Sequence, residues 1–270
     1  MIHNPTKMHD TLDVAMLQQL LTTQVFGRVL CVLTQTTSTN DEVKALALRG
    51  APEGTVVLAE QQTHGRGRQG RSFASPEGVG IYLSVFVRPI IDMERLPQLT
   101  LMVAVATADA ITEVCGLSVD LKWPNDVEID GKKIAGILTE AVIHSGELPV
   151  VIIGIGINVN TALEQLPPAL HERVTSLALV TGAPVSRPQL IARLLAHLEE
   201  LYLAWQYAGM ASILERWRHY SRIRDRYVRF TDAAGTKTGR VVGLDDDGAL
   251  LVQTADGLQQ RLVAGEVVFL

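Results

Sequence analysis

Residues 65–71 read GRGRQGR, and they stand between two apolar stretches, TVVLAE at 55–60 and IYLSVFV at 81–87. The β-branched residues of both stretches predict strands. The first six letters of the segment fit GxGxxG, but a dinucleotide site also needs a helix that begins at the third glycine. Here RSFASPEG follows, and its serines, proline and glycine disfavour a helix. The sequence therefore indicates a glycine-rich loop between two strands, and not a Rossmann turn.

The arginines of this loop, Arg66, Arg68 and Arg71, are separated by glycines. Such a chain can fold closely around a phosphate, with guanidinium groups and backbone N–H groups directed at the charge. Two other interpretations stay open at this point. The segment also fits a solvated surface loop, or an RNA contact of the kind that arginine–glycine segments make.

A second polar segment, KWPND at 122–126, comes at the end of a strand predicted at 118–123. The proline restricts the exit of the chain, so that Lys122 presents one ammonium group suited to a carboxylate or a phosphate. An ordinary strand-to-hairpin turn would use the same residue types. A third segment, GIGIN at 154–158, lies in a strand predicted at 150–160, and its glycines indicate close approach by either a ligand or a neighbouring segment.

Hydrophobic periodicity and end signals place most of the remaining elements. Helices are predicted at 11–24, 98–114, 188–207 and 211–220, with a further strand at 28–34. Another helix begins at Thr39, with Glu42 in capping-box spacing, and ends near Gly50. The Asp130-Gly131 pair favours a type I′ turn between two strands. The apolar stripe of the helix predicted at 188–207 is assigned to the core. Its members are Ile191, Leu194, Leu195, Leu198, Leu201 and Trp205.

The pattern of predicted elements changes after about residue 225, where short strands alternate with the turn pairs Asp247-Gly248 and Asp256-Gly257. This rhythm predicts an antiparallel meander, hence a small SH3-like barrel. We therefore divide the chain into a domain at 1–224 and a second domain at 225–270. The acidic run at 245–247 fails the calcium-loop template and is assigned to a hairpin turn.

Composition excludes several classes of function. The formal net charge of -5 over 270 residues gives no bulk attraction for nucleic acid or anionic lipid. The longest apolar run, around 150–159, is too short to span a membrane. The two cysteines show no CxxC spacing and the seven histidines no HExxH spacing, so we expect no zinc site and a reducing, cytoplasmic compartment. Because GxxxxGK[ST] is missing, an ATP site here would not be a P-loop.

Taken in order, these segments resemble the biotin–protein ligase family. The resemblance rests on Ser38-Thr39-Asn40, Ala59-Glu60 with Gln62, the GRGRQGR loop, Ser75-Pro76, Tyr82-Leu83-Ser84, the KWPND segment, KIAGIL at 133–138, and Gly154 to Asn158. It implies an α+β fold, in which a mixed-sheet catalytic domain resembling class II aminoacyl-tRNA synthetases precedes the SH3-like barrel. It also implies a ligase that forms biotinyl-5′-AMP from biotin and ATP and transfers biotin to a lysine of a biotin carboxyl carrier protein, with Mg²⁺ accompanying ATP.

The resemblance also implies roles for individual residues. Those implied to bind biotin are Ser38, Thr39, Asn40, Gln62, Gly65, Arg66, Arg68 and Lys122. Those implied to bind ATP are Arg66, Arg68, Arg71, Lys122, Lys133, Gly136 and Asn158. The catalytic residues are expected to be Lys122 and Arg68, and no residue is expected to hold a resident metal. Among the biotin-binding set, the hydroxyls and the Gln62 amide are expected to hold the ureido ring.

Two alternative functions are carried forward: a lipoate–protein ligase, which shares the architecture, and a nucleic-acid-binding module that uses the GRGRQGR loop. Some members of the family carry an N-terminal DNA-binding domain, but only 37 residues precede Ser38 here. We therefore expect a mono-functional ligase with neither nucleic acid nor a membrane as partner. A monomer and a homodimer are both compatible with the sequence.

Overall fold

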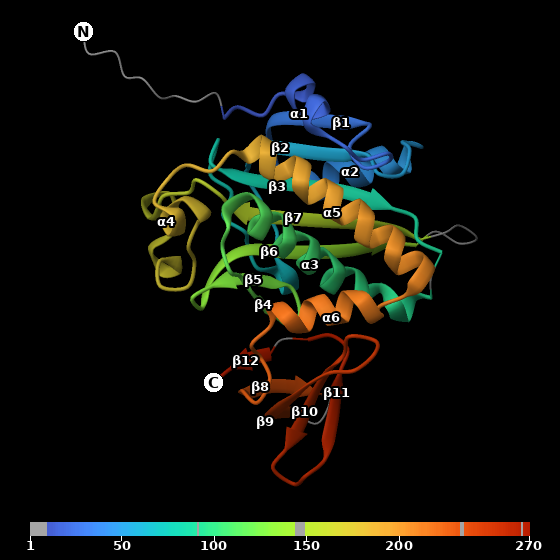
Figure 1. Cartoon of the computed structure of the whole chain (residues 1–270), viewed down its shortest axis with the longest axis vertical. Helices are drawn as coiled ribbons and strands as arrows, with labels where there is room; N and C mark the ends of the chain where they lie inside the picture. The colour runs from blue at the N-terminus through green and yellow to red at the C-terminus, as the bar shows by residue number, and fades with distance from the viewer. Residues whose placement is uncertain (1–9, 91, 144–148, 233–234, 266) are drawn as a thin grey trace.

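The computed structural model describes residues 10–90, 92–143, 149–232, 235–265 and 267–270 (Figure 1). Within these ranges the larger body is built on a seven-stranded sheet in the order β1-β2-β3-β7-β6-β5-β4. Its strands are β1 (Leu30–Thr36), β2 (Val56–Gln62), β3 (Gly80–Val87), β4 (Asp120–Lys122), β5 (Asp126–Ile129), β6 (Lys132–Val142) and β7 (Val150–Asn158). The β1–β2 pair is parallel and the other pairs are antiparallel, which confirms the predicted mixed sheet.

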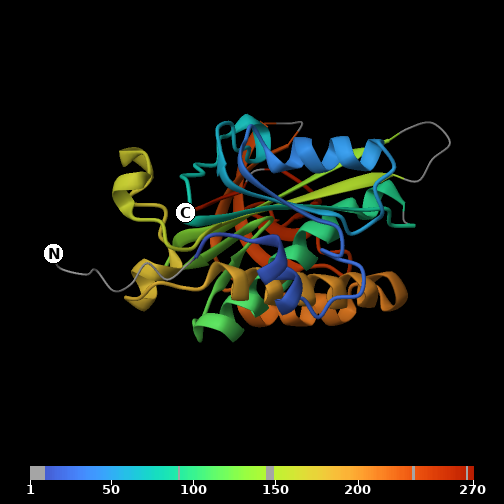
Figure 2. The same ribbon diagram turned by 90° about the horizontal axis from the view of Figure 1, so that it is seen from above.

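Helices cover both faces of this sheet (Figure 2). They are α1 (Val14–Leu20), α2 (Thr39–Leu48), α3 (Leu96–Cys115), α4 (Leu177–Thr181), α5 (Arg187–Ala208) and α6 (Ala211–Tyr220), with 3-10 turns η1 (Arg68–Gly70), η2 (Met93–Arg95), η3 (Leu163–Gln165) and η4 (Pro168–Leu170). The alternation of side chains along β2 shows the two faces. Val57 packs in the small cluster under α2, whereas Leu58 packs in the main core with α3 and α5.

The predicted ends of the long helices are confirmed. α3 has Pro97 in its first turn and ends at Gly116, which adopts φ 67. The predicted core stripe of α5 is buried throughout, and α6 has the predicted bounds. Asp130 and Gly131 both adopt the positive φ that a type I′ turn requires.

Three local predictions need correction. α1 spans only 14–20, because Asp13 caps it at Met16 and the chain before the helix is extended. β1 lies two residues later than predicted. The capping box at Thr39 does not form: Ser38 is the N-cap residue and makes no side-chain cap, while the Thr39 hydroxyl lies 2.7 Å from Ser84 Oγ, in the neighbouring sheet.

Among the described helices, α3 alone is long and apolar enough to cross a membrane, but 72% of its most apolar window is buried inside the protein. That degree of burial is typical of a core helix. α3 is enclosed by the sheet on one side and by α5 and α6 on the other (Figure 1).

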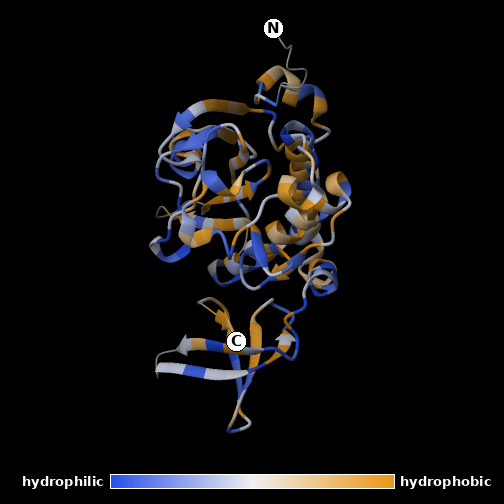
Figure 3. Cartoon of the chain, turned by 90° about the vertical axis from the view of Figure 1, so that its left-hand side faces the viewer, coloured by the Kyte–Doolittle hydropathy of each residue, from blue (hydrophilic) through white to orange (hydrophobic). Residues whose placement is uncertain are grey.

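The C-terminal residues form a separate antiparallel sheet in the order β11-β10-β9-β8-β12, consistent with the predicted SH3-like fold (Figure 3). Its strands are β8 (Tyr227–Asp232), β9 (Gly235–Leu244), β10 (Leu250–Thr254), β11 (Gln259–Leu262) and β12 (Val267–Phe269). Its turn at Gly248 contacts the larger body, where Trp123 Nε1 donates to the Gly248 carbonyl at 3.2 Å. The acidic run at 245–247 lies in this turn, as predicted, and Arg261 pairs with Asp245 and Asp247 there.

Candidate active site

The register of the sheet brings the predicted residues into rows on the face that α2 partly covers. Lys122 pairs with Asp126, Asp126 with Gly136, Gly136 with Gly156, and Gly156 with Tyr82. Residues paired across strands share a face of the sheet. A lysine from the KWPND segment and two glycines from β6 and β7 therefore line up on one surface.

A cavity of about 380 Å³ opens over these rows, within the range for small-molecule sites. The predicted residues that line it are Ser38, Thr39, Asn40, Gln62, Arg66, Arg68, Arg71, Lys122, Lys133 and Gly136. A neighbouring cavity of about 520 Å³ shares Arg71, Lys122 and Lys133 with the first and is also lined by Asn158. Gly65 lines neither cavity; a side chain there would meet the Phe73 carbonyl at 2.4 Å.

The glycines in the floor of the cavity make room for neighbouring protein groups. A Cβ on Gly154 would lie 2.3 Å from Asn40 Oδ1, and one on Gly156 would lie 2.6 Å from the Phe73 ring. The glycines of the GIGIN segment therefore allow close packing by protein groups, and Gly154 and Gly156 also line the cavity. Phe73 comes from the chain just after the GRGRQGR loop, so these glycines seat the end of that loop on the sheet.

The GRGRQGR loop forms a tight hairpin over the cavity. Gly67 N donates to the Arg71 carbonyl at 2.7 Å, and Phe73 N donates to the Gly65 carbonyl at 2.8 Å. Beyond the short turn η1 no helix follows the third glycine, which confirms that the segment is not a Rossmann turn. Gln69 adopts φ 55 at the tip.

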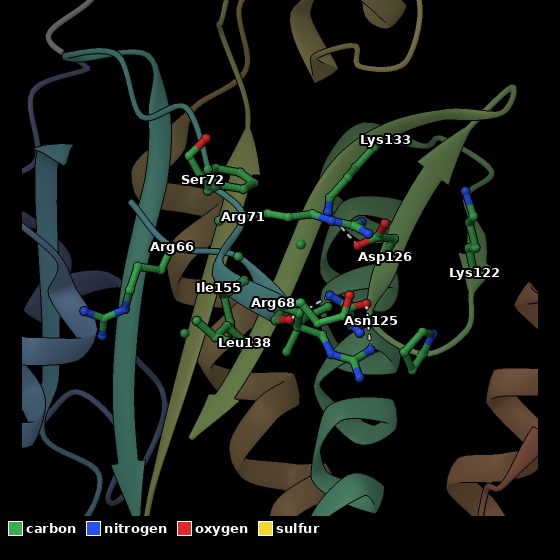
Figure 4. A pocket seen from close by; sticks show the side chains of 18 of the residues that line it. Arg66, Arg68, Arg71, Ser72, Lys122, Asn125, Asp126, Lys133, Leu138 and Ile155 are labelled. Carbon is green, nitrogen blue, oxygen red and sulfur yellow. Dashed lines mark hydrogen bonds and ion pairs between the residues drawn. The ribbon is translucent and has the colours of Figure 1, made fainter. Parts of the chain in front are cut away.

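The three arginines of the loop point in different directions (Figure 4). Arg66 turns away from the others and donates to both carboxylate oxygens of Asp41, at 2.6 and 2.8 Å, and to Glu140 at 3.3 Å. The hydrogen bond that Arg66 donates to Asp41, with the nearby negative charge of Glu140 adding to it, raises the pKa of Arg66. Arg68 Nη1 donates to Asn125 Oδ1 at 3.3 Å, so the loop is held to the KWPND segment as well.

Both lysines of the site are held by carboxylates. Lys122 Nζ lies 2.8 Å from Glu128 Oε1, and Lys133 Nζ lies 2.6 Å from Asp126 Oδ1. The Glu128 side chain is only 10% exposed, whereas the Lys122 side chain is 33% exposed. Each ammonium group therefore has a fixed position and still reaches the cavity.

Hydroxyl and amide groups gather at the other end of the cavity. Gln62 Oε1 accepts from the backbone N–H of Thr39 at 2.9 Å, and Gln62 Nε2 donates to Ser75 Oγ at 2.9 Å. Ser84, fully buried, lies between Thr39 and Asn40 and donates to Asn40 Oδ1 at 2.6 Å. The cavity is thus lined by hydroxyl and amide groups in one part and by the ammonium groups of Lys122 and Lys133 in another.

Known proteins share both parts of this chain. The sequence profile of the Biotin/lipoate A/B protein ligase family matches residues 32–158, and that of the Biotin protein ligase C terminal domain matches residues 225–270. The bifunctional ligase/repressor BirA of Bacillus subtilis is 39% identical over 240 residues, which are 89% of this chain and 74% of that protein. The biotin--[acetyl-CoA-carboxylase] ligase of Mycobacterium tuberculosis is 34% identical over 249 residues, 90% of each chain. This chain belongs to the biotin protein ligase family.

The fold agrees with that of solved biotin protein ligases. The biotin protein ligase from Aquifex aeolicus in complex with biotin and ATP matches with a TM-score of 0.78 and 30% identity, over 90% of this chain and 99% of that chain. A biotin protein ligase from Leishmania major in complex with biotinyl-5-AMP matches with a TM-score of 0.60 and 26% identity. The ligase fold and the small C-terminal domain are therefore both present here.

Several residues of this biotin protein ligase site carried no assigned role at the sequence level. They are Phe73, Ser84, Asn125, Asp126, Glu128, Glu140 and Arg173. The spacing of two glycines does indicate that side chains such as those of Phe73 and Asn40 pack closely on β7. Gly154 and Gly156 are two residues apart, so they share one face of their strand and predict a close neighbour on that face. The acidic partners of the lysines had no such signal, because an ion pair across a hairpin depends on register.

We found no ready-made metal centre in the described ranges, where no three His, Cys, Asp or Glu side chains are placed to hold an ion. Of the seven histidines, those at 3, 9 and 144 lie outside the described residues. Asp126, Glu128 and Glu172 are the carboxylates that line the second cavity, and the first two of them pair with the lysines. This donor set fits an ion that arrives with a phosphate ligand and keeps most of its water.

Proposed function

We propose that this biotin protein ligase activates biotin with ATP to biotinyl-5′-AMP and then transfers biotin to a specific lysine of a biotin carboxyl carrier protein. The observation that carries the proposal is one cavity lined by the Ser38–Asn40 and Gln62 polar groups, by the GRGRQGR loop and by Lys122. The reaction needs these groups together, because it joins a neutral ring, a carboxylate and a triphosphate in one place.

At the polar end, Ser38, Thr39 and Gln62 hold the ureido ring, and Asn40 supports them. The ureido group has two N–H donors and one carbonyl acceptor, so it needs both kinds of partner in an otherwise apolar slot. Leu83, Leu138 and Ile155 supply apolar lining nearby. The valeryl chain would then direct the carboxylate toward Lys122.

At the cationic end, an oxygen of the biotin carboxylate attacks the α-phosphorus of ATP, and pyrophosphate leaves. Both reactants are anions, so the barrier falls when their charge is neutralised and their atoms are aligned. Lys122 would bridge the carboxylate and the α-phosphate, Arg68 would hold the loop over them, and Arg71 and Lys133 would contact phosphate oxygens. Gly136 lets the nucleotide approach the strand, and Asn158 lines the adjoining cavity. No protein nucleophile is required.

Mg²⁺ would enter with the triphosphate, and Asp126 and Glu128 are the residues placed to bind its water shell. When bound, the ion neutralises charge on the phosphate oxygens and on the leaving pyrophosphate. The chain's own part is to orient the phosphates against Lys122 and Lys133.

In the second step the acceptor lysine, as a free amine, attacks the carbonyl of biotinyl-5′-AMP. An amide bond forms, the mixed anhydride bond breaks, and AMP leaves. Water would hydrolyse the same anhydride, so the closed hairpin at 65–71 must exclude solvent until the carrier docks. We also propose a cytoplasmic enzyme, as a monomer or homodimer, that uses neither nucleic acid nor a membrane.

Two assays test the proposal. ATP, Mg²⁺, biotin and a carrier domain should give a single biotin mass gain on the carrier, and biotin should drive ATP–pyrophosphate exchange. Lipoate in place of biotin is the control for the lipoate-ligase alternative. Salt-sensitive RNA binding without any exchange would favour the nucleic-acid alternative. Failure of biotin to support either assay, with any biotinylable carrier, would refute the ligase.

A further inference from the structure

Glu140 on β6 contacts two parts of the site at once. Its Oε2 accepts from Asn40 Nδ2 at 2.5 Å and from Arg66 Nη2 at 3.3 Å. Asn40 begins a chain of hydrogen bonds to the ureido end of the cavity, and Arg66 belongs to the hairpin that covers it. Glu140 itself is not among the residues that line the cavity, so it would act through these two neighbours.

The charge of Glu140 sets the direction of that hydrogen-bond chain. An ionised carboxylate only accepts, so the Asn40 amide must turn its NH₂ group toward Glu140 and its oxygen toward Ser84. Ser84 then gives its only hydroxyl proton to Asn40 Oδ1, at 2.6 Å. The Thr39 hydroxyl, 2.7 Å from Ser84 Oγ, must in turn donate to Ser84.

Fixing these protons decides what the cavity offers a ligand. With its proton committed to Ser84, the Thr39 oxygen presents lone pairs and accepts from a ligand N–H. Gln62 Oε1, which lies 3.1 Å from Thr39 Oγ1, then accepts chiefly from the Thr39 backbone N–H. If the Asn40 amide were reversed, Ser84 would accept from Asn40 and donate to Thr39, and the Thr39 hydroxyl would donate to Gln62 Oε1 at 3.1 Å. A lone pair of the Thr39 oxygen would then be occupied by Ser84, and the oxygen would accept the ligand N–H less well.

The packing around Asn40 leaves no other way to set this order. Asn40 is 5% exposed and Ser84 is fully buried. Gly154 faces the Asn40 side chain so closely that a Cβ there would lie 2.3 Å from Oδ1. The amide is therefore held in place, and only its two ends can exchange. Which end faces Ser84 depends on the partner at the other side, which is Glu140.

We propose that Glu140 is a positioning residue for biotin: its carboxylate orients the Asn40–Ser84–Thr39 chain so that Thr39 accepts a ureido N–H, and it ties that orientation to the hairpin through Arg66. The inference rests on the proposed function, since it takes the ureido ring as the ligand of this end. It assigns to Glu140, which does not line the cavity, control over which lining groups donate hydrogen bonds and which accept them.

The test is a charge-swapped pair. Asn40→Asp places two carboxylates against each other, and biotin affinity should fall at least about thirtyfold. Glu140→Gln keeps an acceptor oxygen but loses the charge, and the affinity should fall about three- to tenfold, near the value of one hydrogen bond. In the double variant Asn40→Asp/Glu140→Gln the amide lies on residue 140 and the carboxylate on residue 40, so Ser84 again donates toward residue 40. Biotin affinity should return to within about threefold of Glu140→Gln alone.

Biotin and ATP affinities would be measured separately by titration calorimetry on the full chain, with melting temperatures to check folding. ATP affinity should change less than about twofold in all three variants. Asp41→Asn is the matched control: it weakens the hold on Arg66 but leaves the Asn40–Glu140 contact intact, so Glu140→Gln should not rescue it. Glu140→Gln with wild-type biotin affinity, or losses in the swapped pair that simply multiply, would overturn the inference. An active wild type distinguishes that result from a failure of the ligase proposal, in which the wild type itself would not bind biotin.

Discussion

The Nζ atom of Lys122 lies 2.8 Å from Oε1 of Glu128, a carboxylate only 10% exposed. The positive charge that is proposed to meet the reacting anions is therefore already balanced by a carboxylate before they bind. A triphosphate that approaches Lys122 also approaches Glu128, and Glu128 must be compensated by the lysine or by the ion that accompanies ATP. The pair fixes the position of the ammonium group in this structure.

Lys122→Ala should abolish adenylate formation, with a loss of about a hundredfold or more in biotin-dependent pyrophosphate exchange. Biotin binding should weaken only modestly, because the ureido end of the cavity is unchanged. Calorimetric titration with biotin and the exchange assay separate these effects. An equal loss in both would mean that Lys122 is structural.

The lysine change leaves Glu128 as an unpaired, nearly buried carboxylate, and that cost is separate from the lost catalysis. The double variant Lys122→Ala/Glu128→Gln should therefore bind ATP about three- to tenfold more tightly than Lys122→Ala, without regaining exchange activity. If ATP binding stays equally weak in both, Glu128 does not repel the triphosphate.

Arg68→Gly should leave a hairpin that closes poorly and releases the activated intermediate. Arg68 Nη1 donates to Asn125 Oδ1 across the cavity, and glycine offers no replacement for that contact. Biotinyl-5′-AMP appearing in solution, and biotin on lysines of an unrelated protein, should rise about tenfold or more. Arg68→Lys, which keeps the charge without the planar fork, should release less. Full retention of the intermediate by Arg68→Gly would contradict the closure argument.

Local signals in the sequence located most of the elements. Pro97 and Gly116 bound α3 because a helix tolerates proline only in its first turn and ends readily at a left-handed glycine. The prediction at Thr39 failed for a tertiary reason. Its hydroxyl bonds to Ser84, a residue 45 positions away on β3, and local spacing carries no information about that neighbour.

The site residues divide in the same way. The resemblance supplied Lys122, Arg68 and the polar residues at 38–40, and the structure gathers them around one cavity. In the structure, Asn158 lines the adjoining cavity and not the first one, and Gly65 lines neither. The carboxylates could not be assigned in advance. Whether Glu128 faces Lys122 depends on the register of β4 against β5, in which Asp120 pairs with Glu128 and Lys122 pairs with Asp126, and spacing along the sequence does not fix that register.

Arg187→Met should destabilise the fold by about 3–5 kcal/mol, because it leaves the buried carboxylate of Glu60 and the partly buried carboxylate of Asp10 without a counter-ion. Arg187 is 1% exposed, and it donates to Glu60 at 2.5 Å and to Asp10 at 2.8 Å. Urea unfolding of the variant and the wild type measures the difference. Arg193→Met, which removes an exposed pair with Glu113, is the matched control and should cost less than about 1 kcal/mol. Equal losses would show that the buried network adds nothing special.

Asp120→Asn should raise the melting temperature at pH 7 by about 1–2 °C and leave it nearly unchanged at pH 3. Burial raises the pKa of Asp120 above its usual value. The folded protein therefore binds that proton more tightly than the unfolded chain, and the associated stability is lost as the pH rises through the folded-state pKa. Asparagine keeps an acceptor for the Arg222 N–H, which Asp120 accepts at 3.0 Å. A lower melting temperature at pH 7 would show that the charge itself is stabilising there.

Gly156→Ala should impair adenylation while leaving the protein folded. A Cβ at this position would lie 2.6 Å from the Phe73 ring, so the ring must leave the sheet and carry the end of the GRGRQGR hairpin with it. Because the displaced ring sits at the edge of the cavity and not in the core, exchange activity should fall about tenfold or more, and the free energy of unfolding should fall by less than about 2 kcal/mol.

Gly67→Ala is the matched control within the loop itself. A Cβ there meets its nearest neighbour, the Arg71 carbonyl, at 3.4 Å, and φ at Gly67 is an ordinary -113, so its loss of activity should be several times smaller. If both variants lost activity equally, the hairpin would be sensitive to any added methyl group, and the seating of Phe73 on Gly156 would not be what holds it closed.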